Sequence, residues 1–153
     1  MSNRSFWFFF CIILCFATCL RFYQFSEIPY THDEYSALYR LQFNSFGELI
    51  EQGVKVDGHP AGVQVFMYYY VKMFGSNPWV VRFPFEILGI LSVALIMVIG
   101  RRWYSSYAAL LAGSIAAVTQ YFIFYSMVAR PYSPGLFFVL LSMFFISGII
   151  KKE

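Results

Sequence analysis

Long apolar runs separated by short polar segments make up most of this chain. Four runs are long enough to cross a bilayer, which requires about 20 predominantly apolar residues. They cover residues 6–23, 83–100, 107–128 and 133–150. The pattern predicts an all-α, polytopic membrane protein with about four transmembrane helices, in which residues 1–153 form a single membrane domain.

A fifth apolar run, residues 61–74, is shorter and contains Gln64 and Lys72. Runs of this length are more often interfacial or re-entrant than spanning. We therefore expect residues 24–82 to form one long loop between the first two spans.

Within this loop the polar and apolar positions predict a helix. Thr31 can cap a helix whose third position is Glu34, which is the arrangement of a capping box. The following aromatic, apolar and amide positions recur at helical spacing: Tyr35, Leu38, Tyr39, Gln42 and Phe43. The result is an amphipathic helix that can lie in the membrane interface. We expect Gly53 to end the helical stretch and residues 57–60 to form a turn.

Basic residues orient the four spans. If residues 61–74 do not cross, then Arg4, Arg101, Arg102 and the Lys151-Lys152 pair all lie on one side. The positive-inside rule makes that side cytoplasmic. This places the N-terminus in the cytoplasm and the 24–82 loop outside, as expected for a multi-pass protein of the inner cell membrane.

Composition agrees with this class: 59% of residues are hydrophobic and only 12% are charged, whereas soluble domains have about 25% charged residues. The net charge of +3 comes without a basic run, so no nucleic-acid partner is expected. Cys11, Cys15 and Cys19 share one helix face. A row of metal ligands is one interpretation, and packing in lipid is the favoured one. The first run lacks a small-x-small cleavage site, which indicates a retained span.

The polar residues that this topology places outside suggest chemistry. Moving a sugar from a lipid phosphate to a hydroxyl needs a base for the acceptor and cations for the departing phosphate. Asp33 or Glu34 could take the proton or hold a divalent metal such as Mg²⁺ or Mn²⁺. Arg82 and Arg130 could neutralise the phosphate with paired donors, with His59 nearby.

Each candidate also has a structural interpretation. Glu34 is equally well explained as the acid of the capping box. His59 precedes Pro60, and a turn residue is the commoner case. Arg82 can form an ion pair with Glu86 at a helix end. Arg130 and Tyr132 can be interface anchors at the end of a span. Their common side of the membrane favours a shared site.

The order of the motifs resembles a known family. Asp33-Glu34 follows the first span. After it come Asp57-Gly58-His59-Pro60, then Gly75 through Arg82-Phe83-Pro84, then Tyr125-Ser126 with Ala129-Arg130-Pro131-Tyr132. This arrangement is similar to the N-terminal part of the GT-C membrane glycosyltransferases, in the protein O-mannosyltransferase and aminoarabinose-transferase-like group (glycosyltransferase family 39).

The resemblance implies that a sugar passes from a polyprenyl-phosphate donor to a protein or lipid acceptor outside the cytoplasm. It implies that Asp33 is the catalytic base, with Glu34 in support. His59 and Arg82 match positions expected near the donor phosphate, and Arg130 falls in the second short outer loop. We expect these three residues and Tyr132 to bind substrate. The second outer loop, which includes Arg130, lacks the acid that often occurs there, so paired loops are not expected to hold a metal.

Family members usually have more than ten spans, so we expect this chain to be an N-terminal fragment, a truncated gene product or part of a split enzyme. The alternative from another class is a small non-enzymatic membrane protein that binds a lipid carrier or serves as an accessory subunit. The two differ in whether Asp33 and Arg82 affect turnover or only association.

Overall fold

The computed structural model describes residues 1–23 and 25–150, and every regular element in these ranges is a helix. The elements are α1 (Asn3–Phe22), α2 (His32–Tyr39), α3 (Phe46–Glu48), a π-helix η1 (Leu49–Val54), α4 (Ala61–Phe74), α5 (Pro78–Trp103), α6 (Ser106–Val118), α7 (Gln120–Met127) and α8 (Tyr132–Ile150). The all-helical prediction is confirmed. Gln24, the first residue of the predicted loop, and the Lys151-Lys152 pair lie outside the described residues.

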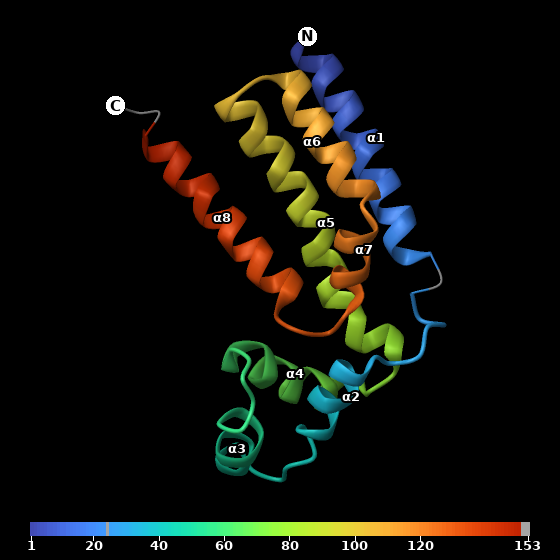
Figure 1. The fold of residues 1–153 in the computed structure, drawn as a ribbon, viewed down its shortest axis with the longest axis vertical. Helices are drawn as coiled ribbons and strands as arrows, with labels where there is room; N and C mark the ends of the chain where they lie inside the picture. The colour runs from blue at the N-terminus through green and yellow to red at the C-terminus, as the bar shows by residue number, and fades with distance from the viewer. Residues whose placement is uncertain (24, 151–153) are drawn as a thin grey trace.

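The long helices form an antiparallel bundle (Figure 1). α1 begins, α5 ends, α6 begins and α8 ends at one end of it, while α2, α3 and α4 lie beyond the other end, which we call the loop end. At the end opposite the loop end, the Arg101 guanidinium donates to Asn3 Oδ1 at 2.8 Å and lies 4.1 Å from the Phe6 ring. Arg4, Arg101 and Arg102 therefore share one end of the bundle, as predicted.

Among the described residues, three helices are individually long and apolar enough to cross a membrane: α1, α5 and α8. The predicted third span, 107–128, is instead the pair α6 and α7, which are bent by 60°. The sequence has no Pro or Gly at the break, where Thr119 adopts an extended conformation with φ −66° and ψ 119°. The pair can form the predicted third span as one broken helix, and the bend itself was not predicted.

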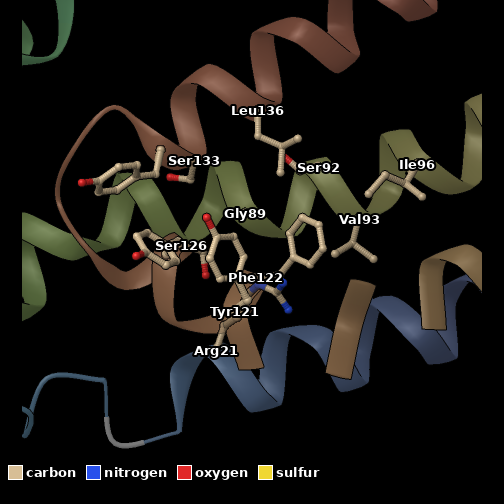
Figure 2. A pocket seen from close by; sticks show the side chains of 12 residues that line it. Arg21, Gly89, Ser92, Val93, Ile96, Tyr121, Phe122, Ser126, Ser133 and Leu136 are labelled. Atoms are coloured by element: carbon tan, nitrogen blue, oxygen red, sulfur yellow. The ribbon is translucent and has the colours of Figure 1, made fainter. Parts of the chain in front are cut away.

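Arg21 supplies the physical reason that this break is tolerated. In a continuous helix the carbonyls of Ala116 and Ala117 would accept from amides four residues later, and the break removes those partners. The buried guanidinium of Arg21, whose side chain is drawn in Figure 2, replaces them. Its Nη1 lies 3.3 Å from the Ala117 carbonyl and its Nη2 lies 3.4 Å from the Ala116 carbonyl. In lipid such groups must be satisfied within the protein. A buried arginine thus stabilises the bend.

We expect Arg21→Met to destabilise the bundle by about 1–3 kcal/mol, because it leaves two buried carbonyls without donors. Thermal unfolding of the purified chain in detergent measures the effect. Arg101→Met is the matched control, since it removes an arginine from the opposite end of the bundle, and it should shift the midpoint much less. Equal shifts for the two variants would contradict a special role for Arg21.

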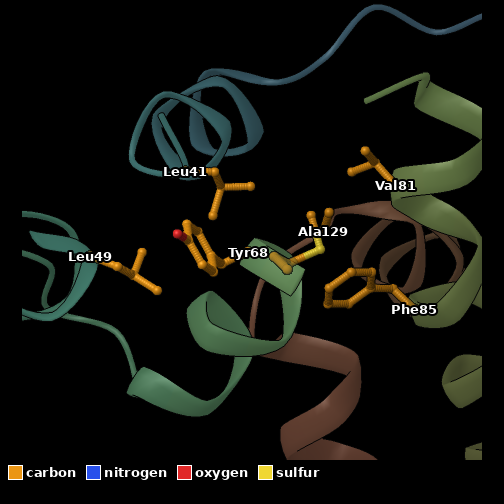
Figure 3. Close-up of a cluster of buried hydrophobic side chains, with 7 residues drawn as sticks. Leu41, Leu49, Tyr68, Val81, Phe85 and Ala129 are labelled. Atoms are coloured by element: carbon orange, nitrogen blue, oxygen red, sulfur yellow. The ribbon is translucent and has the colours of Figure 1, made fainter. Parts of the chain in front are cut away.

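α4 has 14 residues and is not among the candidate spans, which agrees with its predicted non-spanning position. α4 packs the loop against the bundle through a cluster of buried hydrophobic side chains (Figure 3). The cluster consists of Leu41, Leu49, Met67, Tyr68, Val81, Phe85 and Ala129. Because these residues come from α4, α5, the loop and the α7–α8 turn, burial of their apolar surface keeps the loop against the bundle.

The loop helix is shorter than its apolar spacing predicted. The capping box at Thr31 is present, but α2 ends at Tyr39 and does not continue to Phe43. Gly53 does not end the helical stretch either, because it lies inside η1. A Cβ there would be only 3.0 Å from the Arg40 carbonyl oxygen, so glycine allows this close approach of η1 to the end of α2.

Candidate functional site

Asp33 lies in the first turn of α2, half-buried at the loop end of the bundle. The Tyr132 hydroxyl at the start of α8 donates to Asp33 Oδ2 at 3.2 Å. Both residues line a cavity of about 300 Å³, together with Thr31, Tyr125 and others. A carboxylate on the wall of an open cavity can receive a proton from a molecule that enters it.

Glu34, the adjacent acid, has a different environment, since its side chain is fully buried. Its Oε2 accepts from the Thr31 backbone amide at 2.9 Å, which completes the capping box. Its Oε1 also lies 3.4 Å from the Ala129 amide. Two bonds from Arg82, at 2.8 and 2.9 Å, reach the same carboxylate. With these donors around it, Glu34 has no free lone pair for a substrate.

Arg82 is the cation of this pair and is likewise fully buried. Besides the two bonds to Glu34, its Nη1 donates to the carbonyls of Phe25 and Ile28 at 2.6 and 2.8 Å, and its Nη2 donates to that of Pro29 at 3.0 Å. All five guanidinium N–H groups are therefore engaged. Arg82 thus joins α5 to the connection between α1 and α2.

Tyr30 covers this ion pair, with its ring 5.2 Å from the Arg82 guanidinium carbon. Its hydroxyl donates to the Ser76 carbonyl at 2.7 Å. Burial, with a further contribution from the negative charge of Glu34, raises the pKa of Tyr30 to about 12. The phenol remains neutral and acts as part of the cover of the ion pair.

A second polar group surrounds Asp57, whose side chain is 6% exposed. Its carboxylate lies 2.8 Å from Arg40 Nη1, 2.8 Å from His59 Nδ1 and 3.0 Å from Arg130 Nη1. One acid thus gathers two guanidinium groups and an imidazole from three separate parts of the chain. We call Arg40, Asp57, His59 and Arg130 the cationic cluster, because its positive charges outnumber its single negative charge.

Burial alone would raise the pKa of Asp57, but hydrogen bonds from His59 and Arg130 and the charges of Arg130 and Arg40 outweigh it and hold the pKa at about 2. Because the pKa of Asp57 is lower in the folded protein, its ionised carboxylate stabilises the fold at pH values above its ordinary pKa of 3.8. This contribution is lost as the pH falls through the folded-state pKa. Its size is on the order of 2 kcal/mol.

We therefore expect the free energy of unfolding to fall between about pH 4 and pH 2, and this part of the fall to be absent in Asp57→Asn. Unfolding in detergent at a series of pH values measures it. Glu51→Gln is the matched control, because Glu51 pairs only with the exposed Lys55. An identical acid profile for wild type and Asp57→Asn would contradict this assignment.

Tyr132 contacts both Asp33 and the cationic cluster. Its ring lies edge-on to the His59 ring, with centroids 6.5 Å apart, while its hydroxyl bonds to Asp33. The Nε of Arg130 is buried and, among the described residues, has no hydrogen-bond partner. This N–H can therefore still donate a hydrogen bond to a ligand.

The structure thus brings Asp33, Tyr132, His59 and Arg130 together, while Glu34 and Arg82 form a separate sealed pair. Sequence reasoning did not single out Asp57, Arg40 or Tyr125. Asp57 stood inside the quoted Asp-Gly-His-Pro motif, so its position two residues before His59 was an available signal. Tyr125 likewise stood in the quoted Tyr125-Ser126 pair, whereas Arg40 gave no signal, because only a tertiary contact brings it to the site.

Across residues 1–23 and 25–150, no three His, Cys, Asp or Glu side chains gather closely enough to hold a metal ion. Cys11, Cys15 and Cys19 are free and exposed on α1. The site therefore combines one accessible carboxylate, one tyrosine hydroxyl and a cluster of cations. This set can deprotonate a hydroxyl and neutralise a phosphate.

Comparison with known proteins gives one family. Residues 58–153, more than half of the chain, match the dolichyl-phosphate-mannose-protein mannosyltransferases. The matched range includes His59, Arg82, Arg130 and Tyr132 but begins after Asp33 and Glu34. No curated protein and no solved structure matches this chain.

Proposed function

Because this chain belongs to the dolichyl-phosphate-mannose-protein mannosyltransferase family, a family of membrane glycosyltransferases, we propose that its site transfers a sugar from a polyprenyl-phosphate donor to a hydroxyl of a protein or lipid acceptor. The observation that carries the proposal is the accessible Asp33 carboxylate, bonded to Tyr132, which in turn contacts the cationic cluster. A base and a phosphate-binding group are the two parts that such a transfer requires.

In the proposed reaction Asp33 takes the proton of the acceptor hydroxyl. The acceptor oxygen then attacks the anomeric carbon of the donor sugar as the bond from that carbon to the phosphate oxygen breaks. The bonding electrons leave with the polyprenyl phosphate, and the configuration at the anomeric carbon inverts. Tyr132 holds the Asp33 carboxylate toward the cavity through its hydroxyl.

The leaving phosphate gains negative charge, which cations must neutralise. Arg130 and His59 are proposed to do this, as the sequence suggested, and Arg40 joins them through Asp57. The unpartnered Arg130 Nε supplies a donor without breaking an existing bond. Charge-assisted bonds of this kind are about twice as strong as neutral ones.

Glu34 and Arg82 have a positioning role in this proposal, since both are buried and fully bonded. Glu34 was predicted to act in catalysis or in the cap, and Arg82 to bind phosphate. A direct phosphate contact would require Arg82 to leave carbonyl and carboxylate partners that saturate it. We therefore assign to the pair the task of holding α2, and with it Asp33, against α5.

The loop end is proposed to face the outside of the inner cell membrane and the N-terminus the cytoplasm, because the arginines at the opposite end satisfy the positive-inside rule. A donor anchored by its polyprenyl chain would then present its phosphate at the level of the loop. Of the groups at this site, Asp33 is the accessible carboxylate that a divalent metal, Mg²⁺ or Mn²⁺, would bind.

Transfer of labelled mannose from dolichyl-phosphate mannose tests the proposal. Membranes containing the full chain should transfer label to protein or lipid above the level of membranes lacking it, and EDTA would show whether a metal takes part. Binding of the donor without any turnover, alone or with other proteins of the source membrane, would favour the non-enzymatic alternative, a lipid-carrier binder or accessory subunit.

A further inference from the structure

A second cavity lies deeper in the bundle than Asp33. It has a volume of about 240 Å³ and is bounded by the last turn of α1, the middle of α5, α7 and the first turns of α8 (Figure 2). Its lining residues include Arg21, Ser92, Tyr125, Ser126 and Tyr132. Since Tyr125 and Tyr132 also line the cavity of Asp33, the two spaces share a wall.

Arg21 contributes a free donor to this cavity. Its two Nη atoms bond to backbone carbonyls of α1 and α6, but its Nε is buried and has no partner among the residues that the structure describes. Leaving a buried donor unpaired is costly, most of all for a charged group in a membrane. A ligand that supplies an acceptor oxygen would remove this cost.

Three serines supply the complementary acceptors. Ser92 and Ser133 donate their hydroxyl hydrogens to the carbonyls of Leu88 and Phe85, at 2.8 and 3.1 Å. Ser126 Oγ lies 2.8 Å from both Glu86 Oε2 and the Ile123 carbonyl. Because these hydrogens are used, the serine oxygens can only accept from a ligand in the cavity.

The combination discriminates between ligand classes. A hydrocarbon chain would leave the Arg21 Nε without a hydrogen-bond acceptor. The phosphodiester of the donor has no hydrogen to donate to the serine oxygens. A sugar carries hydroxyls that both donate and accept, and its C–H faces can lie on the rings of Tyr121, Phe122 and Tyr125, which line the same space. The volume is below the about 300–1,000 Å³ of sites for drug-sized ligands, which suits a single monosaccharide.

Gly89 lines the same cavity from α5. A Cβ at this position would overlap the Ser126 side chain and come within 3.4 Å of the Arg21 Nε. Glycine therefore allows α7 and Arg21 to approach α5 closely, which brings the free donor and the serine acceptors around one small space.

We propose that this cavity is the binding site for the monosaccharide unit of the polyprenyl-phosphate donor. Arg21 donates to a sugar oxygen, and the serines accept from its hydroxyls. The shared wall of Tyr125 and Tyr132 separates the bound sugar from the cavity of Asp33. Displacement of the Tyr125 ring, with Tyr132 still bonded to Asp33, would open the anomeric carbon to the acceptor at the base. This proposal rests on the proposed function, and it means that the protein recognises its donor lipid through the sugar unit.

Equilibrium binding of two probes to the full chain in lipid nanodiscs tests the proposal: dolichyl-phosphate mannose and dolichyl phosphate, which lacks the sugar. We expect the wild type to bind the mannose-bearing lipid about tenfold more tightly. Ser92→Leu, which fills the cavity, should reduce the ratio of the two dissociation constants to about one without weakening the binding of dolichyl phosphate.

Ser142→Leu is the matched control. Ser142 has the same local bond as Ser92, from Oγ to the carbonyl four residues earlier at 2.8 Å, but lies exposed on α8. Leu136→Phe fills the cavity from α8 and serves in case Ser92→Leu does not fold, with Val139→Phe on the exposed face as its control.

The outcomes separate the two levels of the proposal. Loss of the mannose preference in the filling variants alone supports the sugar site. A wild type that binds both lipids equally, or filling variants that keep the preference, would overturn the sugar site and leave the transferase function standing. A wild type that binds neither lipid would overturn the proposed function and the sugar site with it.

Discussion

Asp33→Asn is expected to reduce sugar transfer by at least about 100-fold, since a positioned general base contributes about 10²–10⁴-fold. The substitution keeps the size of the side chain and its hydrogen bond from Tyr132, but an amide cannot take the acceptor proton. The measurement is the rate of mannose transfer from dolichyl-phosphate mannose at saturating donor, with the amount of inserted protein determined in parallel.

Glu51→Gln provides the control for this prediction, because Glu51 lies in the same loop but pairs only with the exposed Lys55. It should leave transfer near the wild-type rate, and both variants should insert normally. Near wild-type transfer by Asp33→Asn would remove Asp33 from the base role. Normal donor binding with lost transfer would distinguish a catalytic residue from one that only binds substrate.

Arg82→Met is expected to destabilise the loop end by about 3–5 kcal/mol, the usual cost of leaving one member of a buried ion pair alone. Glu34 would remain fully buried without its cation, and three carbonyls between α1 and α2 would lose their donor. Chemical or thermal unfolding of the chain in detergent measures the loss, and limited proteolysis of the loop locates it.

A double substitution tests whether the pair itself is responsible. Glu34→Leu together with Arg82→Met removes both charges, so it should be less destabilising than the sum of the two single changes. Lys55→Met, which breaks an exposed pair, should cost no more than about 1 kcal/mol. Additive effects of Glu34→Leu and Arg82→Met would show that the two side chains act independently, against the structure.

The sequence did not indicate that Asp33 is accessible while Glu34 is fully buried. Both acids follow the first span, and the capping-box spacing correctly gave Glu34 a structural interpretation. The partner that saturates Glu34 is Arg82, 48 residues away. Local spacing does not encode such a pairing, because it depends on how α5 packs against the segment that precedes α2.

The same reason explains why the bend in the third span was not predicted. Residues 107–128 contain no Pro, and their one Gly, Gly113, lies six residues before the break at Thr119, so their composition predicts a continuous helix. The bend at Thr119 is supported by the guanidinium of Arg21, 95 and 96 residues from the carbonyls that it bonds. A charge near the end of the first span was the only visible sign, and it did not indicate which backbone would need it.

What the sequence determined by itself was the class of the protein, its helical spans, the capped helix after the first span and the family to which it belongs. These follow from local quantities: the length of apolar runs against the thickness of a bilayer, residue spacing on a helix, and short motifs. Only the tertiary structure decided which acid is accessible, which cations gather around Asp57 and where the third span bends. Those outcomes depend on contacts between residues far apart in the chain, and the free energy of a buried charge is set by the partners that packing brings to it.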